Sequence, residues 1–169
     1  MNKKIVFIKN FFNLSINQGI NILVAIIATP ILFQNLGESS FGLINLSLSI
    51  FILLSIIISY GYHLNGPKYI SLITQTNNER DFINELISIR VFLALIVSLL
   101  VILIIYFSSL FDGYSTIILF SIPILWSEAI HPVFYLQGKN NLSVLAILNS
   151  ISKLIYLGFI ILFIKSPED

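Results

Sequence analysis

The chain has 169 residues, of which 57% are hydrophobic and 10% are charged, with a mean hydropathy of +0.96 and a net charge of +1. Soluble domains carry about 25% charged residues, so this composition excludes a soluble globular protein and predicts an integral membrane protein. The absence of a basic cluster argues against a nucleic-acid partner, and the lack of cysteine, with only two histidines, argues against disulfides and metal centres. We expect no cofactor.

Five apolar segments are long enough to cross a bilayer, since about 20 helical residues at ~1.5 Å each cover the ~30 Å hydrocarbon core. We expect spanning helices over residues 11–33, 41–63, 86–107, 117–136 and 142–164. The predicted fold is therefore all-α, a polytopic transmembrane helix bundle of about five helices that forms one transmembrane domain over residues 1–169.

The first segment carries a polar stripe. Asn10, Asn13, Asn17 and Asn21 recur at i, i+3, i+7 and i+11, which places them on one helical face with Gln18 beside it. Hydrogen bonds between helices are one interpretation, worth about 0.6 kcal/mol per contact on average. The lining of a hydrated cavity is the other, and the sequence leaves both open.

Polar residues separate the next segments. We expect a turn over residues 34–40, where Gly37 supplies backbone freedom, and an extended polar stretch over residues 64–85. Arg90 lies about one turn inside the third segment. Its guanidinium can snorkel to lipid phosphates or make an anion contact inside the bundle, and both remain open.

The fourth and fifth segments each carry a charge near the middle, Glu128 and Lys153. A charge at the bilayer centre costs at least ~2.5 to 3.5 kcal/mol, whereas the attraction of a pair at ~4 Å and a dielectric constant of ~20 is about 4 kcal/mol. An ion pair between the two residues therefore does not recover the cost of both charges. A polar, hydrated interior is the interpretation that the sequence favours over a purely structural ion pair.

Other polar residues are spaced so that they share a helix face with Glu128 or Lys153 and could line the same polar interior. Two groups each share one helix face: Glu128, His131 and Tyr135 in the fourth segment, and Asn149, Lys153 and Tyr156 in the fifth. Pro123 and Pro132 predict a bent or broken fourth helix, which is common where transporters bind or move and also occurs as a static kink.

The basic residues indicate the orientation in the membrane. With the amino terminus inside, seven of the nine fall on the inner side: Lys3, Lys4, Lys9, Lys68, Arg80, Arg90 and Lys139. By the positive-inside rule, this asymmetry predicts a cytoplasmic amino terminus.

Motifs for catalysis are missing from the sequence: there is no phosphate-binding glycine loop, no HExxH, no GxSxG and no pair of carboxylates on one helix. Glu128 and His131 form a general acid/base pair only in principle, because proton relays in transporters use the same residue types. We expect a protein that is not an enzyme.

Several short motifs, in their order and spacing, resemble the amino-terminal part of bacterial O-antigen and capsular polysaccharide flippases. These are polysaccharide biosynthesis proteins of the MATE-like multidrug/oligosaccharidyl-lipid/polysaccharide exporter superfamily. The matching residues are Asn17-Gln18 with Asn21, Pro30 leading to Leu36-Gly37 and Phe41-Gly42-Leu43, Tyr60-Gly61 with Gly66 and Lys68, Arg90, Pro132 with Phe134, Gln137-Gly138, and Lys165-Ser166-Pro167-Glu168-Asp169.

The resemblance implies a flippase that moves an undecaprenyl-diphosphate-linked oligosaccharide across the bacterial cytoplasmic membrane for O-antigen, capsule or exopolysaccharide synthesis. It implies that Arg90 and Lys153 attract the diphosphate or acidic sugar and that Glu128 is a proton-linked counter-charge, with protons or sodium as the coupling ion and membrane lipids as further partners. The predicted substrate pathway consists of Asn17, Gln18, Asn21, Arg90, Glu128, His131, Asn149 and Lys153.

The family has about a dozen helices in two lobes, and this chain offers five. We therefore expect part of the first six-helix lobe of a two-lobe transporter, a truncated or split product that needs its missing second half or other subunits. A drug/ion antiporter fragment of the same superfamily and a membrane subunit of glycan assembly without transport activity are the alternatives.

Overall fold

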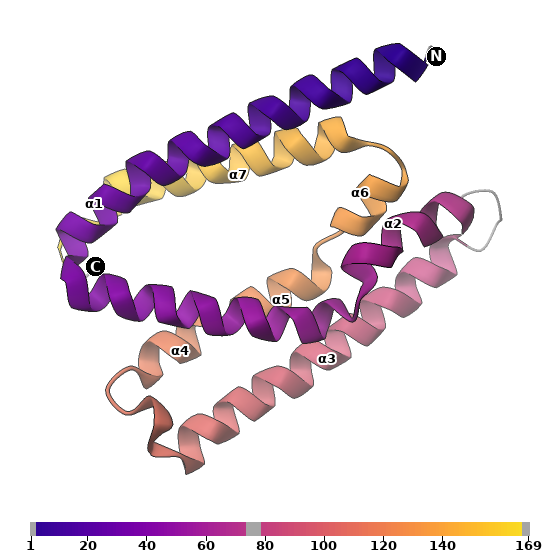
Figure 1. The fold of residues 1–169 in the computed structure, drawn as a ribbon. Coiled ribbons are helices and arrows are strands. Elements are labelled where there is room, and N and C mark those ends of the chain that lie inside the picture. The colour runs from indigo at the N-terminus through magenta and orange to yellow at the C-terminus, as the bar shows by residue number, and fades with distance from the viewer. Residues whose placement is uncertain (1–2, 74–78, 167–169) are drawn as a thin grey trace. The chain divides into compact units, whose positions relative to one another are not determined.

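The computed structural model describes residues 3–73 and 79–166, and every regular element within them is a helix (Figure 1). In chain order these are α1 (Lys3–Ser59), α2 (Tyr62–Ile73), α3 (Glu79–Phe107), the short 3₁₀ helix η1 (Ser109–Phe111), α4 (Ser115–Ser121), α5 (Pro123–Ile130), α6 (Val133–Gly138) and α7 (Leu142–Phe163). Pro167, Glu168 and Asp169, which close the last of the motifs above, lie outside the described residues.

Four helical stretches of the described chain are long and apolar enough to cross a membrane: Ile8–Ile73, Glu79–Phe107, Ser115–Gly138 and Leu142–Phe163. The first of them contains two of the five expected spans. The prediction of an all-α, multi-pass membrane protein is confirmed.

Helix α1 has no loop where a turn was expected over residues 34–40. Gly37 alone leaves the helical conformation, with φ 77° and ψ 167°. Glycine reaches positive φ without the clash that a Cβ atom causes, so one residue replaces a turn. Residues 3–36 and 38–59 form helical arms of about 51 and 33 Å, each long enough to span the hydrocarbon core.

Much of the expected polar stretch over residues 64–85 is helical as well. It contains most of α2, and α3 begins at Glu79 rather than at residue 86. Glu79 and Asp81 lie in the first turn of α3, where carboxylates interact favourably with the helix dipole. The polar residues in this stretch are part of helices and do not end them.

The fourth expected helix is broken, as its two prolines predict. Pro123 begins α5, and His131 has an extended backbone (φ −65°, ψ 118°) immediately before Pro132. The expectation of a continuous face shared by Glu128, His131 and Tyr135 is wrong, because the helical register is lost between α5 and α6.

The chain divides into two compact units: residues 1–42 with 140–169, and residues 43–139. Each unit has its own packing. The single transmembrane domain expected from the sequence stays a prediction.

In the first unit, the polar stripe of α1 pairs with α7, which lies alongside it (Figure 1). The Asn13 amide nitrogen donates to the Ser143 hydroxyl at 2.7 Å, and the Ser150 hydroxyl donates to the amide oxygen of Asn17 at 3.2 Å. The same face continues with the buried side chains of Val24 and Ala28. For these asparagines the structure supports hydrogen bonding between helices.

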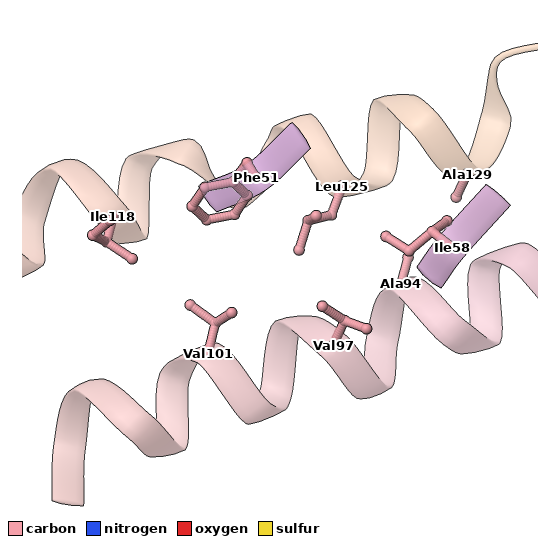
Figure 2. Close-up of a cluster of buried hydrophobic side chains, with 8 residues drawn as sticks. All are labelled: Phe51, Ile58, Ala94, Val97, Val101, Ile118, Leu125 and Ala129. Atoms are coloured by element: carbon pink, nitrogen blue, oxygen red, sulfur yellow. The ribbon is translucent and has the colours of Figure 1, made fainter. Parts of the chain in front are cut away.

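The second unit contains an apolar core between the second arm of α1, helix α3 and the α4–α5 segment. Figure 2 shows Val97 and Val101 of α3 pointing toward Leu125 and Ile118 on the opposite segment. The buried members are Phe51, Ile58, Ala94, Val97, Val101, Ile118, Leu125 and Ala129. This core holds α5 against α3 and thereby positions the residues around the helix break.

Glycines allow α2 and α6 to approach closely in the same unit. A Cβ atom at Gly138 would lie 2.5 Å from Ile70 Cβ and 2.8 Å from the carbonyl oxygen of Pro67, and one at Gly66 would lie 3.0 Å from Phe134 Cβ. The Pro67 carbonyl oxygen belongs to the backbone, so it cannot move aside as the end of a flexible side chain can. The contact between the two helices therefore requires glycine at position 138.

We predict that Gly138→Ala destabilises the protein by about 1–3 kcal/mol, as overpacking does. Gly158→Ala is the matched control, because a Cβ atom there meets nothing within 4 Å and alanine favours the helix by up to about 1 kcal/mol. Thermal unfolding of the purified variants in detergent measures both effects. Equal unfolding temperatures for the two variants would contradict the close contact.

We also predict a coupling energy of about 0.6 kcal/mol between Asn13→Ala and Ser143→Ala in a double-mutant cycle, because the two side chains share a hydrogen bond. Unfolding by sodium dodecyl sulfate in mixed micelles measures it. The control cycle pairs Ser143→Ala with Gln18→Ala, whose side chain is exposed, and should be additive. Additivity in both cycles would contradict the helix-to-helix hydrogen bond.

Candidate functional site

Arg90 of α3 is a buried charged residue of the second unit, with 4% of its surface exposed. Its Nη2 atom lies 3.0 Å from Glu128 Oε1 and also donates to the backbone carbonyl of Glu128. Its Nη1 atom donates to the backbone carbonyl of His131 at 3.2 Å. One guanidinium thus contacts a carboxylate and two backbone oxygens.

The two carbonyls lie where α5 ends. The last carbonyls of a helix have no partner within that helix and carry a partial negative charge. Pro132 cannot donate a backbone hydrogen bond, and His131 is already extended. Arg90 satisfies this helix end, and the planar guanidinium suits the task because its donors point in several fixed directions.

A cavity of about 130 Å³ lies beside the ion pair. The ring centre of Phe134 is 5.5 Å from Arg90 Cζ, within the range of a cation–π contact. The Nε atom of Arg90 is buried and has no hydrogen-bond partner in the described part of the chain. The cavity is lined by Ser59, Tyr62, Arg90, Glu128, His131, Val133 and Phe134.

This geometry decides between the two interpretations of Arg90. The guanidinium makes an inward anion contact, and the anion is the carboxylate of Glu128. Within the second unit the partner of Glu128 is Arg90, whereas the ion pair with Lys153 of the first unit stays a prediction. A guanidinium can satisfy the helix end and the carboxylate together, which a single ammonium group does less well.

The first unit contains the other predicted site residues. Lys153 is exposed on α7, with its ammonium group 5.7 Å from the ring centre of Tyr156, and Asn149 is exposed one turn earlier. On α1, Gln18 is exposed, whereas Asn21 is half-buried and its buried Oδ1 atom has no partner among the described residues.

The structure therefore brings Arg90, Glu128 and His131 to one cavity and places the remaining predicted residues on α1 and α7. Sequence reasoning missed the serine partners of the asparagine stripe. Ser143, Ala146 and Ser150 recur at i, i+3 and i+7, the spacing of the asparagines, so a search for a matching small polar face would have found them. It also missed Tyr62 as part of the cavity, for which the sequence carries no signal.

Groups of three or more histidine, aspartate or glutamate side chains that could hold a metal ion do not occur in the described ranges.

Comparison with known proteins gives two matches. Residues 7–169 match the family described as "Polysaccharide biosynthesis protein". The chain is also 22% identical over 167 residues to a protein of Escherichia coli K12 named "Putative O-antigen transporter", covering 95% of this chain and 39% of that protein. The chain thus spans about two fifths of the length of this relative.

No solved structure matches the chain significantly. The family match extends over nearly all of the sequence and includes the helix break, the buried ion pair and both helices of the polar stripe. The chain belongs to the polysaccharide biosynthesis protein family.

Proposed function

We propose that the chain is part of a flippase that moves an undecaprenyl-diphosphate-linked oligosaccharide across the bacterial cytoplasmic membrane. The family and the name of the E. coli relative support a role in polysaccharide export. The observation that carries the proposal is the ion pair of Arg90 and Glu128 beside a cavity and next to the apolar core of the second unit.

Arg90 can exchange Glu128 for another anion. A diphosphate is a stronger acceptor than a carboxylate and can compete with Glu128 for the guanidinium, while the Nε atom of Arg90 offers a further donor. Protonation of Glu128 would remove its charge and release Arg90 in the same way. We therefore assign Arg90 to anion binding and Glu128 to coupling with a proton gradient.

Lys153 is the second cationic group of the proposed pathway. It lies near the middle of α7, and its ammonium group has a ring contact but no ion pair among the described residues. A charge at that depth is costly when it faces lipid, so we assign it to a hydrated path for an anionic cargo. For sugar contacts, Gln18 and Asn149 are better placed than Asn17, whose amide oxygen accepts from Ser150.

We predict that Glu128→Gln and Lys153→Ala each reduce oligosaccharide export by about tenfold or more, as expected for the loss of one charge-assisted contact. Glu85→Gln and Lys9→Ala are the matched controls, since both residues are exposed. Surface polysaccharide is measured in cells that depend on the protein, normalised to its amount in the membrane. Unchanged export in both Glu128→Gln and Lys153→Ala would overturn the proposal.

We predict a cytoplasmic amino terminus, which places the η1–α4 loop outside and the start of α3 inside. Because the chain has no cysteine, Asp112→Cys and Arg80→Cys each create one thiol at an exposed position. A membrane-impermeant maleimide should label only Asp112→Cys in intact cells and both variants after permeabilisation. Labelling of Arg80→Cys in intact cells would reverse the orientation.

A further inference from the structure

A second and larger cavity, of about 370 Å³, lies at the turn between α1 and α2. Its volume falls within the range of roughly 300–1,000 Å³ that is typical of small-molecule sites. Four of its six lining residues are aromatic, and none is charged: Tyr60, Gly61, Tyr62, Asn65, Tyr69 and Phe82.

The aromatic rings form a continuous series around this cavity. Tyr60 and Tyr62 are stacked, with ring centres 6.1 Å apart and an angle of 29° between the planes. Tyr62 meets Phe82 edge-on at 6.4 Å, and Phe82 meets Tyr69 at 6.3 Å. The outer members remain accessible, since Tyr60 is 65% exposed and Tyr69 is 51% exposed.

The backbone at Tyr60 is strained. Its φ is 48°, and Gly61 follows with φ 74°. Positive φ is uncommon for a residue as bulky as tyrosine and is disfavoured relative to glycine. A glycine would make the same turn without strain, so the contribution of tyrosine at this position is its ring.

Polar groups complete the cavity. Within the described residues, neither the side-chain amide of Asn65 nor the phenol groups of Tyr60, Tyr62 and Tyr69 make a hydrogen bond. A pyranose ring has apolar C–H faces that stack on aromatic rings and a rim of hydroxyl groups that bond to amides and phenols. A quaternary ammonium ion also binds aromatic rings but leaves such donors and acceptors unused.

We propose that this cavity binds an uncharged pyranose sugar, stacked on Tyr60 and Tyr69 and hydrogen-bonded by Asn65. The inference rests on the proposed function, because it makes the cavity a recognition site for the sugar portion of the lipid-linked cargo. With the amino terminus inside, the turn between α1 and α2 faces the cytoplasm, where a cargo moving outward is collected.

Saturation-transfer NMR on the purified protein in lipid nanodiscs, free of glycoside detergents, tests the proposal with the methyl glycosides of glucose, galactose and N-acetylglucosamine as probes. At least one of them should bind. Tyr60→Gly keeps the turn and removes the ring, so it should weaken binding by about threefold to tenfold, as expected for the loss of one stacking contact. Tyr69→Ala should do the same, and Tyr60→Phe should bind within about twofold of the parent.

Tyr106→Ala is the control, because Tyr106 is 82% exposed, pairs with Phe107 and lies outside the cavity. The proposal is overturned if none of the three glycosides binds or if Tyr106→Ala weakens binding as much as Tyr60→Gly. Tyrosines that only anchor the protein at the membrane interface would give the first of these results.

The binding experiment involves no transport, so its failure is separate from failure of the proposed function. If no glycoside binds but export depends on Glu128 and Lys153, only the proposal of the sugar site is refuted. If glycoside binds but export does not depend on Glu128 or Lys153, the proposed transport pathway is refuted and the sugar site is retained.

Discussion

The ion pair between Arg90 and Glu128 is the interaction on which the second unit depends. A buried charge in an apolar bundle costs several kcal/mol, and the attraction of one pair is of about the same size. The guanidinium adds hydrogen bonds to two carbonyls at the end of α5, so the helix break and the charge stabilise each other. Without Arg90, the broken helix would expose unpaired carbonyls to an apolar surrounding. Without the break, Arg90 would lose the acceptors that make its burial tolerable.

Much of the fold could be predicted from the sequence, because apolar length in a membrane protein translates almost directly into helices. Pro123 and Pro132 also indicated the broken segment. The boundaries were harder to predict. A helix continues past the edge of the bilayer wherever its polar residues suit helix termini, as Glu79 does, and a turn can shrink to one residue, as at Gly37. Hydropathy alone predicts neither the extension of a helix past the bilayer nor a turn made by one residue.

The two charged residues of the candidate site were predictable from the sequence, but the pairing between them was not. Arg90 and Glu128 were identified because ionised residues are rare at such depth. Which cation meets Glu128 depends on how α3 packs on α5, and the apolar side chains of that core carry no signature of a partner. Some of the residues that carry the resemblance to the flippase family also have a structural role. Arg90, Phe134 and Gly138 all lie where α3, α2 and α6 pack, so part of that motif serves close packing and the helix break.

The asparagine stripe of α1 bears on how the protein is made. Its partners on α7 are about 130 residues further along the chain, as the bond from Asn13 to Ser143 illustrates. At roughly 5–20 residues per second, synthesis of the intervening chain lasts about 6 to 26 seconds. During that interval the amides of the first helix face the membrane or the insertion machinery without their final acceptors. The amides of α1 therefore need other polar surroundings until α7 is inserted beside them.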